Sequence, residues 1–158
     1  MIIRTATEQD IPQILAFIQH LADYEKLSHE VVATEQLLSE TLFGSKPFAE
    51  VLIAETDENI SAGFALFFYN YSTFLAKPGI HLEDLFVLPD FRGLGVGKEL
   101  LKKLAAITVE RGCGRLEWAV LDWNKPAIEF YQAQGAIVMD GWLTNRVTAD
   151  ALKKLASD

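Results

Sequence analysis

The sequence predicts a single α/β domain over residues 1–158, built on a mixed β-sheet with helices on both faces. Strand-like runs in the first half lie close together along the chain, which favours antiparallel pairing. Later apolar runs alternate with helical stretches, which indicates parallel strands in the centre of the sheet. Half of the residues are apolar, so a chain of this length can bury a substantial core.

The first half of the chain shows two helical patterns followed by two strand-like runs. Thr7–Asp10 resembles a capping box and precedes apolar residues at helical spacing. Thr34 can cap a second, shorter helix. The predicted elements are helices over 10–24 and from Thr34 to Leu42, and strands over 51–54 and 62–71 around a turn at 57–59.

The second half alternates strands and helices around several glycines. Gly112 and Gly114 can end one helix, Pro126 suits the first turn of the next, and Gly135 can stop it. Asp140-Gly141 is typical of a tight hairpin turn. The predicted elements are strands over 81–88 and 116–121, helices over 96–111 and 126–134, a closing hairpin of strands 136–139 and 142–147, and a final helix over 149–155.

Composition excludes several classes of function. Fourteen basic and 22 acidic residues give a formal charge of −8, which argues against nucleic acid as the main partner. No apolar run approaches the roughly 20 residues of a membrane-spanning helix, and residues 1–20 do not resemble a secretory signal. Cys113 is the only cysteine, so we expect a structural role for it and a cytoplasmic location for the protein. His20, His29 and His81 show no ligand spacing, so we expect no metal site.

The most informative motif is the glycine-rich turn Arg92–Lys98, between a strand and a helix. Glycines let a ligand approach the backbone closely, and the N–H groups of the following helix attract an anion such as a pyrophosphate. A Walker A loop does not fit, because Arg92 stands where it needs glycine and Glu99 replaces its hydroxyl. A dinucleotide fingerprint does not fit either, because Lys98 stands where it needs its third glycine.

The pattern Arg-x-x-Gly-x-Gly resembles the acyl-CoA pyrophosphate loop of the GNAT acetyltransferases. Leu82–Asp84, Asp122–Asn124, Phe130-Tyr131 and Gly135-Ala136 extend this resemblance to the diamine acetyltransferases, including the thialysine N-epsilon-acetyltransferase branch. It runs from about residue 3 to residue 155. It implies the GNAT fold, acetyl-CoA as acetyl donor, a small-molecule primary amine as acceptor, and a homodimer.

The resemblance also implies three groups of acetyl-CoA contacts. The backbone of one strand would bind the pantetheine arm, the glycine-rich turn would hold the pyrophosphate, and a helix start would flank the thiol end. For Asn124 and Pro126 the alternative is a well-capped turn without a ligand. The implied residues are Leu85, Phe86 and Val87; Arg92, Gly93, Leu94, Gly95, Val96, Gly97 and Lys98; and Asn124, Lys125, Pro126 and Ala127.

Acetyl transfer to an amine needs a base. A primary alkyl amine has a pKa of about 10.4, so roughly one molecule in a thousand is neutral at pH 7 and able to attack a thioester. Glu83 is the candidate, acting directly or through water, and regular alternation places Asp84 on the opposite face of its strand. The alternative is that Glu83 is a strand-end carboxylate paired with a basic side chain.

Other site residues follow from the resemblance. Tyr131 matches the tyrosine that protonates the departing CoA thiolate; the alternative is an ordinary aromatic of a helix face. Tyr24, Glu25, Glu117 and Trp118 match amine-binding segments, with a solvated helix end and a core strand as the alternatives.

The acceptor is predicted from a second segment. Polyamine enzymes of the family carry an acid and a tryptophan where this chain has Ser72 and Phe74. We therefore expect thialysine, lysine-like amino acids or short diamines to be preferred over spermidine and spermine. A polyamine or peptide N-acetyltransferase remains the enzyme alternative, and a non-catalytic CoA-binding sensor is the alternative from another class. A nicotinamide-dependent oxidoreductase is disfavoured by the failed fingerprint.

Overall fold

A computed structural model describes residues 1–157, which divide into two compact units. The first unit, Met1–Leu121, contains the whole sheet, and the second begins at Asp122. Among the described residues, no helix is both long and apolar enough to cross a membrane. The helices of the first unit are α1 (Ile11–Tyr24), α2 (Glu35–Leu42) and α3 (Val96–Glu110), and those of the second are α4 (Lys125–Ala133) and α5 (Ala149–Ser157).

The sheet has five strands in the order in which they occur along the chain. Neighbouring strands from β1 to β4 pair antiparallel, and β5 pairs parallel to β4. This confirms the predicted mixed sheet with antiparallel N-terminal strands. The strands are β1 (Ile2–Thr5), β2 (Glu50–Glu55), β3 (Ser61–Ser72), β4 (Lys77–Val87) and β5 (Leu116–Glu117).

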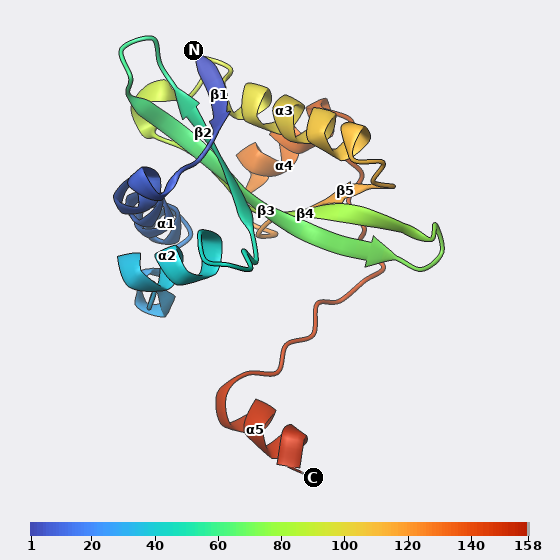
Figure 1. Ribbon diagram of the computed structural model, residues 1–158. Coiled ribbons are helices and arrows are strands. Elements are labelled where there is room, and N and C mark those ends of the chain that lie inside the picture. The colour runs from blue at the N-terminus through green and yellow to red at the C-terminus, as the bar shows by residue number, and fades with distance from the viewer. Residues whose placement is uncertain (158) are drawn as a thin grey trace. The chain divides into compact units, whose positions relative to one another are not determined.

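One face of the sheet packs against α1 and α2 (Figure 1). Phe17 of α1 stacks on Phe64 of β3, with ring centroids 5.2 Å apart, and lies 6.1 Å from the ring of Phe86 on β4. Val51 and Ile53 of β2 belong to the same buried cluster. Burial of these large side chains supplies most of the driving force for this half of the core.

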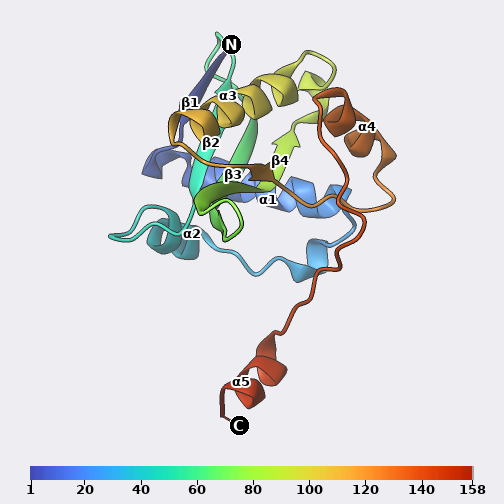
Figure 2. The ribbon, with the colours of Figure 1, turned by 90° about the vertical axis from the view of Figure 1, so that its right-hand side faces the viewer.

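The other face of the sheet packs against α3, as the two views in Figure 1 and Figure 2 show. Leu100 and Leu104 of α3 are completely buried. At the end of this helix, the guanidinium of Arg111 lies 5.9 Å from the ring centroid of Phe67 and forms an ion pair with Glu50 at 2.6 Å. Since Phe64 and Phe67 face opposite sides of β3, helices cover both faces of the sheet, as predicted.

The predicted capping box lies at the short 3-10 helix Glu8–Asp10 just before α1, and the predicted cap of α2 is present. The backbone N–H of Thr7 donates to the carboxylate of Asp10 at 2.7 Å, and Thr34 Oγ1 accepts the N–H of Leu37 at 3.2 Å. Arg4 on β1 forms two hydrogen bonds of 2.8 Å to Asp10. These bonds hold the pKa of Asp10 down at about 2, so β1 and the start of α1 are joined by a strong charged contact.

Three elements differ between the prediction and the structure. Strand β1 was not predicted, because four residues are too short to show an alternation; it is defined by its pairing with β2. The strand expected over 116–121 pairs with β4 only through Leu116 and Glu117. The hairpin predicted over 136–147 was wrong, because these residues form only a turn at 140–141. Within the second unit no further strand supports such a hairpin, and an isolated pair of strands is marginally stable in water.

Candidate active site

The site is organised by a β-bulge in the middle of β4. Leu66 of β3 pairs with Asp84, but the next residue, Phe67, pairs with Leu82. Glu83 is therefore an extra residue without an opposite partner on β3. Bulges interrupt the side-chain alternation of a strand and redirect a side chain, and they are common beside active sites.

The bulge changes which side chains share a face. Residues directly opposite each other in a sheet point to the same side. Phe86 pairs with Phe64 and Asp84 with Leu66, while His81, five residues before Phe86, pairs with Phe68. Since 64, 66 and 68 alternate regularly on β3, His81, Asp84 and Phe86 all lie on the α1 face.

The side chain of Glu83 lies close to His81 on this face. Its Oε2 lies 3.4 Å from Nε2 of His81, although regular alternation predicts that Glu83 and Asp84 diverge. The expectation that Asp84 occupies the opposite face was wrong, because it assumed an unbroken strand. The adjacent carboxylates of Glu83 and Asp84 therefore face the same region of the surface.

The carboxyl groups near the bulge affect one another electrostatically. Burial raises the pKa of Asp84 to about 6, with further contributions from the charges of Glu83 and Glu25. Burial also raises the pKa of Glu25. Three carboxyl groups with one histidine form a site that attracts a cation and can accept a proton near neutral pH.

Glu25 is positioned by the end of α1. Lys26 adopts a left-handed conformation with φ of 62°, and its N–H donates to the carbonyl of Asp23 at 3.1 Å. The N–H of Leu27 donates to the carbonyl of Ala22 at 2.8 Å. This is a Schellman ending, which stops the helix at Tyr24 and leaves Glu25 as its C-terminal cap residue.

Arg92 joins this helix end to β4. Its guanidinium lies 5.2 Å from the ring centroid of Tyr24 and 5.5 Å from that of Phe86. Its Nε donates to the carbonyl of Val87 at 2.9 Å. Arg92 therefore packs on the predicted amine-pocket residue Tyr24 as well as preceding the glycine-rich turn.

The glycine-rich turn has the conformation that only glycine adopts readily. Gly93 has φ of 75° and Gly95, the N-cap of α3, has φ of 83°. A Cβ atom at either position would have no neighbouring heavy atom within 4 Å, so the space beside the turn is open. The first N–H groups of α3 have no intrahelical acceptor, and exposed Lys98 lies in the same turn. This arrangement can bind an anion.

The C-terminal part of β4 has one open edge. Leu85, Phe86 and Val87 pair with β3 on one side. On the other side, β5 pairs only with Ile80 and His81, so within residues 1–157 no strand covers this edge of β4 beyond His81. Backbone groups along an open strand edge can bind an extended ligand as an added strand would.

Glu117 is already engaged within the sheet. Its Oε1 lies 2.8 Å from Nε of Arg115 and accepts a hydrogen bond of 3.2 Å from Asn70 Nδ2. Its register partner on β4 is His81, so Glu117 lies on the same face as His81 and Asp84. These contacts favour the structural interpretation of Glu117, and Trp118 beside it is half-buried.

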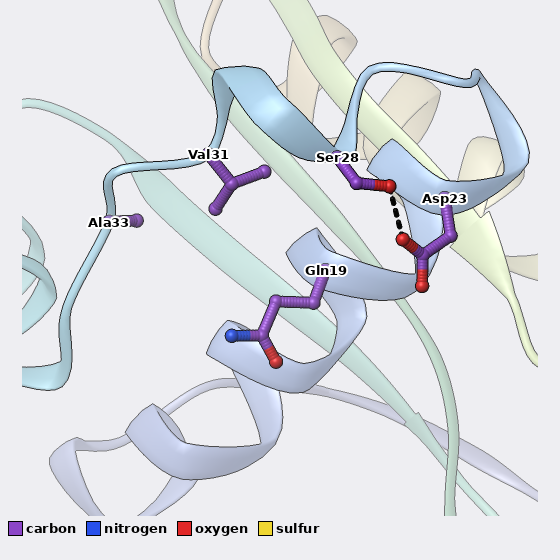
Figure 3. A pocket seen from close by; sticks show the side chains of 5 residues that line it. All are labelled: Gln19, Asp23, Ser28, Val31 and Ala33. Carbon is purple, nitrogen blue, oxygen red and sulfur yellow. Dashed lines mark hydrogen bonds between the residues drawn. The ribbon is translucent and has the colours of Figure 1, made fainter.

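A shallow pocket near the end of α1 was not predicted from the sequence (Figure 3). Its lining includes Asp23, whose carboxylate accepts a hydrogen bond from Ser28. None of the predicted site residues lines it, although Tyr24 directly follows Asp23 in the chain. The lining residues are Gln19, Asp23, Ser28, Val31 and Ala33.

The second unit carries the remaining candidates. Asn124 caps α4, with its Oδ1 accepting the N–H of Ala127 at 3.4 Å, and Lys125 and Pro126 open the helix. Tyr131 lies in the second half of α4, half-buried, with its ring 5.2 Å from that of Phe130. The helix predicted here and its cap are confirmed.

Ser72 and Phe74 lie at the far end of the β3–β4 hairpin. Ser72 is only 5% exposed and its Oγ accepts the N–H of Leu75 at 3.3 Å, while Phe74 is fully exposed. Ser72 pairs with Lys77, which precedes Glu83 by six residues on β4. At about 3.3 Å per residue, Ser72 lies roughly 17–20 Å from Glu83 within one chain. Ser72 is therefore remote from Glu83 and Asp84 within one chain.

Known proteins resemble the whole of this chain. Residues 15–136 match the family model of the Acetyltransferase (GNAT) family. The chain is 37% identical over 164 residues to thialysine N-epsilon-acetyltransferase of Mus musculus, covering 98% of this chain and 96% of that protein. It is 36% identical over 197 residues to an L-ornithine N5-acetyltransferase of Arabidopsis thaliana, covering 97% and 86% of the two chains.

A solved structure shows the same fold. An integron cassette protein from the mobile metagenome of V. cholerae superposes with a TM-score of 0.81 at 26% identity, covering 99% of this chain and 98% of that one. The mixed sheet, the bulge beside an open strand edge and the glycine-rich turn thus occur in a chain whose relatives transfer acetyl groups. The chain belongs to the GNAT family of acetyltransferases.

Proposed function

We propose that this enzyme transfers the acetyl group of acetyl-CoA directly to a primary amine of a small molecule, namely thialysine, a lysine-like amino acid or a short diamine. The observation that carries the proposal is the bulge, which places Glu83 beside Asp84 and next to the open edge of β4. A base, a cation-attracting group and a strand edge for the acyl donor are thereby adjacent in the first unit.

Glu83 removes a proton from the acceptor ammonium, directly or through one water molecule. The neutral amine then attacks the thioester carbonyl, a C–N bond forms and the C–S bond breaks. The Tyr131 hydroxyl donates a proton to the leaving thiolate, and the second amine proton passes to the tyrosinate and restores the hydroxyl. The proton on Glu83 also passes to solvent, so one proton is released for each acetyl group transferred.

The acetyl donor would be held by backbone groups. The open edge of Leu85–Val87 fits the amides of the pantetheine arm, and the turn from Gly93 to Lys98 fits the pyrophosphate. Arg92 would support the strand and the turn from its position over Tyr24 and Phe86. Asn124 to Ala127 would flank the thiol end.

The acceptor would be bound through its positive charge. Asp84, Glu83 and Glu25 supply the negative charge, with Tyr24 at the end of the same helix. Glu117 and Trp118 would act at the margin of the pocket. Relatives named for acetylation of thialysine and of ornithine support an amino-acid acceptor with a terminal amine.

Three further properties belong to this proposal. The two compact units would work as one catalytic domain, because the candidate residues are divided between them. The enzyme would act as a homodimer in the cytoplasm. It would need no metal, because the proposed transfer uses only side-chain acid and base groups.

The test is a panel of amines incubated with acetyl-CoA and read by mass spectrometry. We expect acetylated thialysine, lysine or ornithine to form faster than acetylated spermidine, spermine or a peptide N-terminus. Preference for spermidine or for a peptide would establish the alternative acceptor classes. Binding of CoA without any acetylated product would establish a sensor and overturn the proposal.

A further inference from the structure

His81 is a basic group next to the base that we propose. Its Nε2 lies 3.4 Å from Oε2 of Glu83 across the bulge. The two side chains differ in exposure: 28% of the His81 side chain is accessible, against 55% for Glu83. The histidine is thus a half-buried support for a more exposed carboxylate.

The imidazole is fixed by the strands on both sides. Phe68, directly opposite on β3, lies with its ring centroid 5.1 Å from that of His81. Glu117 is the register partner on β5, and it is held by Arg115 and Asn70. The His81 ring therefore packs against Phe68 at an interplanar angle of 32°, with Nε2 on the side of Glu83.

The groups around His81 are predominantly acidic. Glu83 and Asp84 lie on β4 itself, and Glu117 on β5 is neutralised by Arg115. From α1, the charge of Glu25 acts on Asp84. On β3 the facing groups are uncharged, namely Phe68 and Asn70. Protonated His81 is a cation that can pair with Glu83 in this environment, as the ammonium group of a bound ligand can.

We propose that His81 is a positioning residue for Glu83, and that its protonated form competes with the acceptor ammonium for the Glu83 carboxylate. This inference rests on the proposed role of Glu83. The neutral imidazole orients the carboxylate while leaving it available to the amine. The protonated imidazole forms an ion pair with Glu83, which lowers both its proton affinity and its attraction for the substrate.

The expected consequence is an acid-side rise in the KM for the amine. Histidine side chains ordinarily titrate near pH 6.5, so the protonated form becomes more abundant between pH 8 and pH 5.5. Competition for Glu83 can therefore raise the amine KM by up to roughly tenfold between pH 8 and pH 5.5. The KM for acetyl-CoA is not affected, because that ligand does not use the carboxylate.

The first experiment compares His81→Gln with wild type. We expect the amine KM of wild type to rise by up to roughly tenfold from pH 8 to pH 5.5, and that of His81→Gln, whose amide cannot be protonated, to stay nearly constant over this range. His29→Gln is the matched control, because His29 also lies 3.4 Å from a glutamate, Glu30, but both side chains are more than 70% exposed. An amine KM that follows the same pH profile in all three proteins would overturn the inference.

A second measurement does not depend on the stability of a variant. The His81 imidazole resonance of the wild-type protein is titrated by NMR with and without thialysine, in the absence of acetyl-CoA. Bound ammonium should shift the titration of His81 to lower pH, because the substrate cation replaces imidazolium at Glu83. A titration that does not move when thialysine binds contradicts the competition.

Glu83→Gln separates the two proposals. If this variant keeps full activity, Glu83 is not the base and the proposed mechanism fails whatever His81 does. If Glu83→Gln is inactive and His81→Gln follows the wild-type pH profile, only the inference about His81 fails.

Discussion

Asp84 lies directly opposite Leu66 in the β3–β4 ladder, so its carboxyl group faces the apolar side of the sheet that α1 covers. Burial at this position raises the pKa of Asp84 from its usual 3.8 to about 6, with the charge of Glu83 as the next contribution. The folded protein therefore binds this proton more tightly than the unfolded chain does.

We expect Asp84→Asn to stabilise the protein at high pH. Charged Asp84 lowers the free energy of unfolding fully above pH 6, and this cost disappears as the pH falls from 6 through 3.8. The difference between the two pKa values corresponds to roughly 3 kcal/mol as an upper bound. Thermal denaturation at pH 8 and pH 4 checks this: the gain should be present at pH 8 and absent at pH 4. Glu58→Gln, in an exposed turn, is the control and should leave stability unchanged at both pH values.

Glu83→Gln should lower kcat/KM at neutral pH by about 10²–10⁴-fold, the range for loss of a general base. The variant keeps the size of the side chain but cannot accept a proton. Raising the pH should recover part of the rate, because more of the amine is then neutral in solution. Steady-state kinetics from pH 6 to pH 10 make the comparison, and a wild-type pH profile would exclude Glu83 as the base.

Tyr131→Phe should reduce kcat about 10²-fold or more and leave acetyl-CoA binding close to wild type. The variant removes only the hydroxyl that we propose as proton donor, and the ring can still pack beside Phe130. Tyr71→Phe, on the exposed hairpin, is the matched control. Single-turnover rates with saturating acetyl-CoA are the measurement, and equal rates in all three proteins would remove Tyr131 from the mechanism.

Gly95→Asp should weaken CoA binding by at least about tenfold, since it adds bulk and negative charge where a pyrophosphate is proposed to lie. Gly112→Asp is a matched control, because Gly112 also has a positive φ, 67°, and open space around it, but lies beyond the other end of α3. Both variants carry similar backbone strain. Calorimetric titration with CoA should therefore separate them, and equal affinities would place the pyrophosphate elsewhere.

The position of Ser72 changes what we expect from Ser72→Asp. Polyamine enzymes of the family carry an acid at this position, but Ser72 is buried in the hairpin and its Oγ accepts the N–H of Leu75. We now expect the ratio of kcat/KM for thialysine and spermidine to change less than about twofold, since a distant charge is largely screened. Competition kinetics on wild type, Ser72→Asp and Ser72→Ala give the answer. A clear shift toward spermidine in Ser72→Asp alone would mean that this position reaches an amine pocket, in its own chain or in a second copy.

Elements with a local signal were predictable from the sequence. Thr34 and Asn124 cap helices because a side-chain oxygen can bond a nearby N–H, and such contacts lie within a few residues. The glycine turn was predictable for a related reason, since Gly93 and Gly95 adopt backbone angles that other residues avoid. Strands β2 and β3 were also predicted from the sequence, because each contains a continuous apolar run.

Features that depend on pairing were not predictable. His81–Val87 reads as one regular strand, and only the register against β3 reveals the extra residue at Glu83. Strand β1 is likewise defined by its partner. Residues 136–147 have strand-like composition, but composition does not supply the neighbouring strand that a hairpin needs. The exposure of Phe74 and the burial of Ser72 follow from where the hairpin turns, which is a property of the whole β3–β4 pair.

Glu83, the residue of β4 without a partner on β3, can be compared with an insertion into the strand. Removal of Glu83 would let Asp84–Leu66 and Leu82–Phe67 follow one another in an uninterrupted ladder, so a shortened chain could fold with a more regular sheet. The proposed base is thus equivalent to an insertion of one codon into an otherwise ordinary strand. Deletion of this one residue would therefore remove the proposed base without changing any residue of the core.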